Sequence, residues 1–464
     1  MTAVTADAPS TLLPARWQMT VSLGSHIILS CFGVAFPLII WVMHGRGLGR
    51  GDRAGDPTAL ELAQRWSKVA AVLFAVGAVS GTVLSFEMGL LWPSFMRTYG
   101  DVIGLPFALE GIAFFAEAIF LGLYLYGWGR LPARLHRRLL VPIAVAGVVG
   151  TFCILAVNAW MNDPSGFTLV DGKVTGVEPL AAMFNDALWM QFVHMWVAAV
   201  MVVGFLVAAV YARGMLVGRR DHHHRLGFSV PFAFAAVAAI AQPITGHLAG
   251  LRLADGQPSK LAAMELAATT ESRAPMRIGG VFVDGEPRYA VEIPWLGSLI
   301  ARNSPDASVP GFDVVALEDR MDDGLVTTVH LAFQAMVAIG TGLMVASIWY
   351  LYQRRRGHDP LARTWFLWFA VVAGPAAVAA LEFGWITTEV GRQPWIVYGV
   401  MRIEEAVATG NNVWVTFVVL CVLYIAMITG SVLVLRSMAR RWRNGEGADL
   451  PTPYSHLGSH EVHA

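Results

Sequence analysis

The feature that most constrains this chain is a series of long apolar stretches with few charged residues. Nine stretches can be placed, each of about 20 residues or more, which is the length that a helix needs to cross a bilayer. Because lipid offers the backbone no hydrogen-bond partners, these stretches are predicted to be helices. They run over Val21–Met43, Lys68–Trp92, Gly104–Trp128, Leu139–Trp160, Leu188–Tyr211, Phe228–Leu248, Val326–Tyr352, Thr364–Trp385 and Asn412–Leu435.

The amino-acid composition places the chain in the same class. Of its 464 residues, 56% are apolar and only 14% are charged, whereas soluble globular proteins carry about 25% charged residues. The 33 Lys and Arg balance the 33 Asp and Glu, so no basic face for nucleic acid is expected. We therefore predict an all-α polytopic membrane protein that lies in the lipid bilayer and binds no nucleic acid.

The positions of the arginines predict how the helices are oriented. Each odd-numbered stretch is followed by an arginine cluster, for example Arg134 to Arg138 after the third stretch and Arg354 to Arg356 after the seventh. Short cytoplasmic loops accumulate Lys and Arg. The N-terminus is therefore expected outside and the C-terminus in the cytoplasm.

One connection is far longer than the others. About 75 residues separate the sixth and seventh stretches, against roughly 2–8 in most connections between helices. This segment mixes Gly and Pro with apolar pieces such as Ile293-Pro294-Trp295, which predicts a partly ordered cap on the outer face. The expected organisation is helices one to six in residues 1–248, an outer loop in 249–325, helices seven to nine in 326–440 and a cytoplasmic tail in 441–464.

Ionisable and sulfur-containing side chains gather in the outer half of the predicted membrane region. A charged residue at a helix centre costs about 2.5–3.5 kcal/mol on insertion scales, so such residues are functional candidates. His and Met on facing helices are ligands of a six-coordinate haem iron, whereas a single ligand leaves one face of the iron open to oxygen. The candidates are His26, Glu87, Glu110, Glu117, His194, His247, His330, Met336, Glu389 and Arg392.

Each candidate also has an ordinary structural interpretation. A single membrane histidine is as often a hydrogen-bonded helix contact as a ligand, and Met336 alone would be core filler. Glu110 and Glu117 are seven residues apart and share one face of their helix. They suit proton conduction or a redox centre, or they lie in a water-filled crevice. The joint occurrence of these residues at one depth favours a haem protein.

Several short strings resemble subunit I of the cytochrome bd-type quinol oxidases. The most specific are Gly391-Arg392-Gln393-Pro394-Trp395 and Lys260-Leu261-Ala262-Ala263-Met264-Glu265. The other strings are Gly100-Asp101-Val102-Ile103-Gly104, Leu109-Glu110-Gly111, Phe114-Phe115-Ala116-Glu117, Asn158-Ala159-Trp160-Met161 and Phe192-Val193-His194. They follow the family's order and its nine-span layout over nearly the whole chain.

The resemblance implies a set of haem ligands. His194 and Met336 look like the axial pair of a low-spin haem b. His26 and Glu389 look like the single ligands of a high-spin haem b and of haem d, and the assignment between these two haems stays open. The haem d could also be a third haem b. Three further residues match positions that lie beside the haems in this family: Trp385, Arg392 and Asn158.

The resemblance also implies catalytic roles and partners. Glu110 and Glu117 look like the proton-delivery and haem-site acids, with Glu110 an alternative iron ligand, and Lys260 and Glu265 open a loop that resembles the family's quinol-oxidising loop. The implied oxidase takes electrons from membrane quinol at the outer face and reduces O2 to water with cytoplasmic protons. It would generate a membrane potential without pumping. A second membrane subunit (subunit II), a small accessory subunit and a location in the bacterial plasma membrane are also implied.

Some positions depart from the family pattern. Gln334 stands two residues before Met336, where an arginine is common. His247 and His330 lie near the quinol side and have no counterpart in the pattern.

Two other functions compete with this interpretation. A proton-coupled secondary transporter would use the buried acids and histidines as a relay, but no repeat symmetry is evident. A b-haem electron-transfer anchor without an oxygen site would need only paired ligands, and the unpaired His26 and Glu389 disfavour it.

Overall fold

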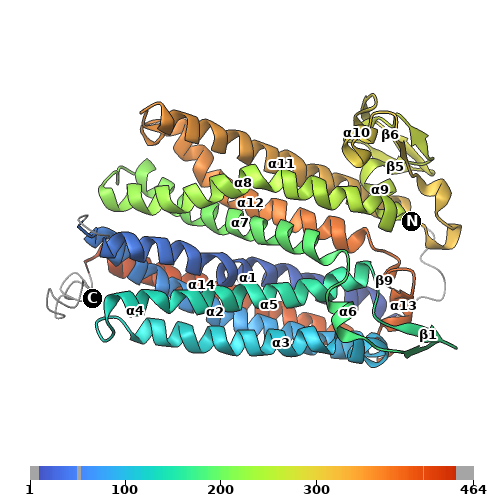
Figure 1. Cartoon of the computed structure of the whole chain (residues 1–464), viewed down its shortest axis with the longest axis horizontal. Helices are drawn as coiled ribbons and strands as arrows, with labels where there is room; N and C mark the ends of the chain where they lie inside the picture. Colours follow the sequence, from blue (N-terminus) through green and yellow to red (C-terminus); the bar gives the residue numbers. More distant parts are fainter. Residues whose placement is uncertain (1–9, 50–53, 411, 446–464) are drawn as a thin grey trace.

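The structure is a computed structural model that describes residues 10–49, 54–410 and 412–445. Within these ranges nine helical segments are long and apolar enough to cross a membrane, which confirms the predicted fold class. They lie along the long axis of the molecule (Figure 1). The long helices are α1 (Leu12–Leu48), α2 (Pro57–Leu91), α3 (Pro93–Tyr126), α5 (Leu140–Asn162), α7 (Leu188–Leu216), α8 (His222–Gly256), α11 (Asp323–Arg355), α12 (Thr364–Val390) and α14 (Val413–Arg443).

Shorter elements cover the ends of these helices. The short helices are α4 (Ala133–Arg138), α6 (Pro179–Met183), α9 (Pro258–Glu265), α10 (Leu296–Arg302), α13 (Ile403–Ala406) and the 3-10 turns η1 (Phe312–Val314), η2 (Leu317–Asp319) and η3 (Pro360–Ala362). The strands are β1 (Thr168–Val170), β2 (Lys173–Thr175), β3 (Glu271–Ser272), β4 (Met276–Ile278), β5 (Val281–Val283), β6 (Glu286–Arg288), β7 (Val291–Ile293), β8 (Ser308–Val309), β9 (Trp395–Val397) and β10 (Met401–Arg402). They pair antiparallel as β1 with β2, β3 with β8, β4 with β7, β5 with β6 and β9 with β10.

The starts of several long helices follow from short sequence signals. Asp56, Asp221 and Asp322 cap α2, α8 and α11, because each carboxylate accepts a hydrogen bond from a backbone N–H of the first turn. Such a cap contributes about 1 kcal/mol.

Most of the long helices extend beyond the predicted stretches, and two of these extensions affect the site. α8 continues through Gly256 instead of ending near Leu248, and α12 continues through Val390, so that Glu389 lies in its last turn. A helix does not stop where the hydrocarbon ends; it continues until a stop signal. For α8 this signal is Pro258, because a proline disfavours the helical conformation in the residue before it.

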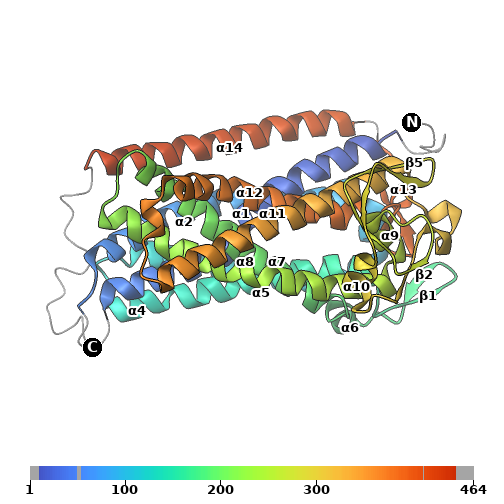
Figure 2. The same cartoon turned by 90° about the horizontal axis from the view of Figure 1, so that it is seen from above.

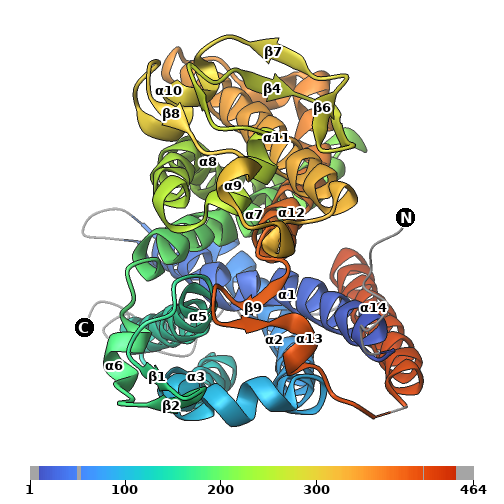
Figure 3. The same ribbon diagram turned by 90° about the vertical axis from the view of Figure 1, so that its right-hand side faces the viewer.

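The long helices form two groups that are clear in the end-on view (Figure 3). In the first group, α7 and α11 each contact both α8 and α12, so these four helices form a bundle with α7 and α11 at opposite corners. In the second group, α1 contacts α2, α5 and α14, and α3 contacts α5. α1 also contacts α7 and therefore joins the groups. α14 lies along the edge of the molecule (Figure 2).

The main core lies between α1 and the four-helix bundle. Phe36, Phe205, Phe232 and Phe366 are almost fully buried there. Many apolar side chains on the outer faces of α2, α3 and α14 are exposed instead, as expected for helices that face lipid or another membrane subunit.

The long segment between α8 and α11 is folded over one end of the four-helix bundle (Figure 1). It begins with α9, continues through β3 to β7, α10 and β8, and returns through η1 and η2 to α11. Phe282, Phe312 and Met321 form an apolar cluster with Val326 and Val329 of α11, which fixes this segment on the bundle. We refer to residues 266–322, which follow α9, as the loop domain.

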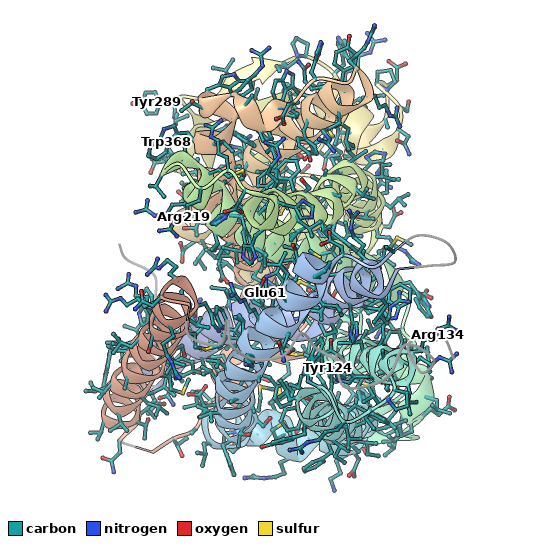
Figure 4. The ribbon with its side chains drawn as sticks, turned by 90° about the vertical axis from the view of Figure 1, so that its left-hand side faces the viewer. Glu61, Tyr124, Arg134, Arg219, Tyr289 and Trp368 are labelled. Atoms are coloured by element: carbon teal, nitrogen blue, oxygen red, sulfur yellow. The ribbon has the colours of Figure 1, made fainter. Side chains whose placement is uncertain are left out.

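The arginine clusters share the opposite end of the molecule. Arg134 and Arg219 project from this end (Figure 4). The connections there also contact one another, since His222 Nε2 lies 2.8 Å from Asp56 Oδ2. The assignment of this end to the cytoplasm remains a prediction. Of the predicted tail (441–464), the residues from 446 onward lie outside the described residues. Arg50 and Arg53, which follow the first stretch, also lie outside them.

Candidate functional site

His194 lies in the second turn of α7 and is held by α8. Its Nδ1 lies 3.1 Å from Thr245 Oγ1, and that hydroxyl donates to the Gln242 carbonyl oxygen at 3.0 Å. Because a hydroxyl has only one proton, Thr245 must accept from Nδ1, which therefore carries the proton. The Gln242 amide nitrogen lies 3.1 Å from Nε2 and 3.3 Å from Nδ1. With Nδ1 protonated, the amide donates to the lone pair on Nε2. This is the tautomer that a metal ligand needs.

His26 on α1 has the same arrangement with a different hydroxyl. Its Nδ1 lies 2.9 Å from Ser80 Oγ of α2, and Ser80 donates to the Gly77 carbonyl oxygen at 3.0 Å. Nε2 therefore carries the lone pair here too, and it has no hydrogen-bond partner among the described residues. A Cβ on Gly81 would lie 3.0 Å from His26 Cε1, so the glycine leaves space beside the ring.

Met336 lies on α11, at the corner of the four-helix bundle opposite His194 on α7. A Cβ on Gly384 of α12 would lie 3.0 Å from Met336 Sδ, and a Cβ on Gly246 of α8 would lie 3.1 Å from His194 Cε1. The two glycines therefore allow both predicted ligand side chains to pack closely against the neighbouring helices. A histidine and a methionine on opposite helices of one bundle can serve as the two axial ligands of a haem between them.

Glu389 has a partner for each of its carboxylate oxygens. Asn158 Nδ2 of α5 donates to Oε1 at 2.7 Å, and Arg392 Nη2 donates to Oε2 at 2.6 Å. Arg392 Nε and Nη1 are buried and have no hydrogen-bond partner within the described part of the chain. These two guanidinium donors can bind a further anionic group, and a haem propionate is such a group. Trp385 lies one turn before Glu389 on the same face of α12.

Lys260 of α9 adds a buried amine to this polar cluster. The side chain lies on α9, is 4% exposed and donates from Nζ to Asn162 Oδ1 of α5 at 2.8 Å. Burial lowers the pKa of Lys260 to about 7; the positive charge of Arg392 acts in the same direction and Glu389 opposes it. Lys260 can therefore gain or lose a proton near neutral pH.

Glu265 ends α9 and faces a different neighbour from Lys260. The two residues are five positions apart, which places them about 140° apart around the helix. Burial raises the pKa of Glu265 to about 7, and the nearby positive charge of Arg277 opposes this shift. The two predicted quinol-site residues therefore lie on opposite sides of α9, Lys260 toward Glu389 and Glu265 toward the loop domain.

Glu110 and Glu117 lie two turns apart on one face of α3. Glu117 is 9% exposed, and its Oε1 would lie 3.1 Å from a Cβ on Gly33 of α1. The Glu117 carboxylate therefore packs directly against α1, the helix that carries His26. Glu110 is less deeply buried.

Sequence reasoning missed one buried acid, Glu382 of α12. Its Oε2 would lie 3.1 Å from a Cβ on Gly24 of α1, and its Oε1 is buried with no hydrogen-bond partner in the ranges that the structure describes. Glu382 and Glu389 are seven residues apart, the same spacing as the two acids of α3. Applied to α12, the spacing rule would have found it.

The described residues contain no group of three or more His, Cys, Asp or Glu that could hold a bare metal ion. A haem iron needs only one or two protein ligands, because the porphyrin supplies the others. The membrane helices carry isolated histidines in the tautomer of a metal ligand, together with a methionine and a carboxylate. This architecture is that of a polytopic membrane protein suited to haem.

Comparison with known proteins gives the family. The chain matches the family cytochrome bd terminal oxidase subunit I over residues 14–443 and belongs to it. It is 33% identical over 430 residues to a Bacillus subtilis (strain 168) protein that bears the provisional name cytochrome bd menaquinol oxidase subunit I, with 91% of this chain and 95% of the relative covered. It is 28% identical over 472 residues to cytochrome bd ubiquinol oxidase subunit 1 of the same organism, with 98% and 99% covered.

A solved structure supports the same conclusion. The bd oxidase from Geobacillus thermodenitrificans matches with a TM-score of 0.87 at 36% sequence identity, and the match covers 94% of this chain and 99% of that chain. The chain is thus a cytochrome bd-type terminal oxidase subunit I and a multi-pass protein of the bacterial plasma membrane. The family implies haem cofactors, and the competing secondary transporter is set aside because the family is one of oxidases.

Proposed function

We propose that this chain holds haem iron through His194, Met336, His26 and Glu389 and oxidises quinol beside α9. The observation that carries the proposal is the state of the two histidines. In each, a hydroxyl that already donates to a backbone carbonyl accepts from Nδ1 and leaves the lone pair on Nε2. An imidazole nitrogen that carries a lone pair is what iron binding requires.

The ligands divide between haems by their number. His194 and Met336 supply two axial ligands and are proposed to hold a low-spin haem b. His26 and Glu389 supply one each and are proposed to hold a high-spin haem b and haem d, in an order left open, with a third haem b as the alternative to haem d. When bound, haem supplies one-electron transfer and an iron that binds oxygen. Asn158, Trp385 and Arg392 orient the Glu389 site, and the free donors of Arg392 would bind a propionate.

Quinol is proposed to bind where α9 meets the loop domain. Oxidation of a quinol releases two protons, so the site needs a base that is partly deprotonated at neutral pH. Glu265 has this property, since burial raises its pKa to about 7. Lys260 supplies a cation or a hydrogen-bond donor for the quinol oxygens. The names of the relatives include both menaquinol and ubiquinol oxidases, and the proposal is made for quinols as a class.

Protons for water formation are proposed to come from the cytoplasmic side through Glu117 and Glu110. The Glu117 carboxylate lies against α1 and is nearly buried, and Glu110 lies two turns closer to the predicted outer end. If protons are released outside and taken up from the cytoplasm, turnover builds a membrane potential without pumping. Subunit II and a small accessory subunit are the proposed partners, with quinol and O2 as substrates.

A visible spectrum of the oxidase purified in detergent with its partner subunits tests the haem proposal. We expect reduced-minus-oxidised bands of b-type haem together with a red-shifted chlorin band, and pyridine extraction should identify both haems. Only b-type bands would support the third haem b in place of haem d. The absence of any haem would refute the ligand assignment.

A further inference from the structure

His330 lies in the second turn of α11, where the loop domain packs on the helix. Its side chain is 0% exposed. Nδ1 lies 2.7 Å from the carbonyl oxygen of Met264 on α9, and Nε2 lies 2.9 Å from the carbonyl oxygen of Gly279 between β4 and β5. We call this contact of one ring with two carbonyls the His330 bridge.

The two partners fix the protonation state of the ring. A backbone carbonyl oxygen only accepts hydrogen bonds, whereas a neutral imidazole has one donor nitrogen and one acceptor nitrogen. A neutral His330 would therefore point a lone pair at one of the two carbonyl oxygens. The doubly protonated ring donates to both. Met264 also lies in the last turn of α9, where unpaired carbonyls and the helix dipole favour a cation.

Neighbouring residues of α11 hold the same part of the loop domain. Gln334, one turn after His330, accepts from the Gly279 N–H at 2.7 Å and donates to the Arg277 carbonyl oxygen. Thr327 Oγ1 accepts from the Phe282 N–H at 2.9 Å. One face of α11 thus binds the backbone on both sides of the turn between β4 and β5. Among the described residues of α11, His330 alone also has a side-chain hydrogen bond to α9.

The His330 bridge connects this face to Glu265, because Met264 is the residue before it. The charged groups on the surrounding elements include Glu265 and Lys260 of α9. Arg277 of β4 pairs with Glu271 at 3.1 Å and with Glu292 at 3.0 Å. Further charged residues of these elements include Asp323 at the start of α11 and Glu389 and Arg392 at the end of α12. Glu265 is the ionisable group on α9 nearest in sequence to the bridge.

We propose that doubly protonated His330 is a positioning residue for quinol oxidation, which holds the end of α9 and thereby Glu265 in place relative to α11 and the loop domain. The proposal rests on the quinol site proposed above. Loss of the second proton as the pH rises breaks one of the two contacts and loosens the end of α9. His330 itself does not touch quinol.

Hydrogen exchange on the complete oxidase tests the bridge without quinol. Protection of the peptide amides in residues 264–282, corrected for the intrinsic effect of pH on exchange, should be lower at alkaline pH than at acid pH. In His330→Gln it should be about tenfold lower at the acid end, the effect of losing one hydrogen bond to a charged donor, and independent of pH. The matched control is His247→Gln, because among the described residues the His247 ring has a hydrogen bond only with the Asn303 side chain, at 2.8 Å, and its loss should change nothing in residues 264–282.

Steady-state oxidation of a short-chain quinol tests the positioning role. His330→Gln should raise the KM for quinol at acid pH to the value that the wild type reaches at alkaline pH, while the haem spectrum is unchanged. Wild-type protection that does not depend on pH would overturn the bridge, and this result needs no variant. A lost bridge with an unchanged KM would overturn the positioning role. Failure of the quinol site itself would be recognised separately, by a Glu265→Gln variant that oxidises quinol at the wild-type rate.

Discussion

At the scale of single residues, the position of a proton decides what each polar side chain can do. The hydroxyls of Ser80 and Thr245 set the tautomers of His26 and His194, because each hydroxyl donates its proton to a backbone carbonyl oxygen and can only accept from the ring. Burial acts in opposite directions on Lys260 and Glu265 and brings the pKa of both side chains to about 7. Residues with ordinary reference pKa values thereby become able to exchange protons at neutral pH.

Replacing His194 tests the low-spin site. His194→Ala should abolish the low-spin b-type signal in the reduced-minus-oxidised spectrum, because Met336 alone cannot hold a six-coordinate iron. The protein should still insert, since the rest of α7 is apolar. His247→Ala is the control at the same end of the membrane. An unchanged low-spin signal in His194→Ala would rule out this residue as a ligand.

The pH profile of quinol oxidation tests the paired groups on α9. Below a pH of about 7, Glu265 is protonated and cannot accept a proton; above it, Lys260 loses its charge. The wild-type rate should therefore peak near neutrality. Glu265→Gln should remove the acid limb and lower the maximal rate by about 100-fold, which is typical for loss of a general base. Lys260→Gln should remove the alkaline limb, and a profile unaffected by either change would contradict both roles.

At the scale of elements, glycines determine where the helices leave room. Gly246 and Gly384 lie beside the two predicted ligands of the low-spin site, on the two helices that separate α7 from α11. The same bundle carries Pro243 inside α8, next to Gln242. Membrane helices tolerate such prolines when neighbouring groups satisfy the freed backbone.

Filling this space should exclude haem while leaving the helix intact. Gly246→Val adds side-chain atoms beside His194 and should weaken haem retention by about tenfold or more, since overpacking costs about 1–3 kcal/mol. The matched control is Gly250→Val, one turn further along α8, where an added Cβ meets nothing within 4 Å. The measurement is the haem-to-protein ratio after purification. Equal haem content in both variants would show that Gly246 does not border the haem site.

At the scale of the whole molecule, the two ends of the helical array carry different chemistry. α9 and the loop domain lie at one end, and Arg134 and Arg219 project from the other (Figures 1 and 4). The proposed quinol oxidation at one face and the proposed proton uptake from the other require this polarity. The exposed apolar faces of α2 and α3 are compatible with lipid and with subunit II.

Proton supply can be tested in the assembled oxidase in liposomes. Glu117→Gln should slow oxygen reduction and the build-up of membrane potential to the same extent, because both depend on the same protons, while the haem spectrum stays normal. Glu61→Gln is the control acid, since Glu61 lies near the arginine-rich end and its carboxylate pairs with Arg65 one turn away on α2. Normal turnover in Glu117→Gln would remove this residue from the proton path.

The sequence by itself determined the class of the protein. Nine membrane-crossing segments, the position of the loop domain and the candidate residues follow from patterns within single segments, because the preference of an apolar helix for lipid acts locally along the chain. The spacing of Glu110 and Glu117 is another pattern of this kind. Helix ends at Gly256 and Val390 were less predictable, since hydropathy does not register where a helix stops outside the hydrocarbon.

Only the tertiary structure decided how the candidate residues are used. Asn158 and Glu389 are 231 positions apart in sequence yet form one hydrogen bond, and His330 meets Met264 from 66 positions away. The tautomer of His194, the free donors of Arg392 and the separation of Lys260 from Glu265 all depend on such partners. Hydrogen bonding and burial are set by residues that are distant in sequence, so no pattern within one segment can specify them.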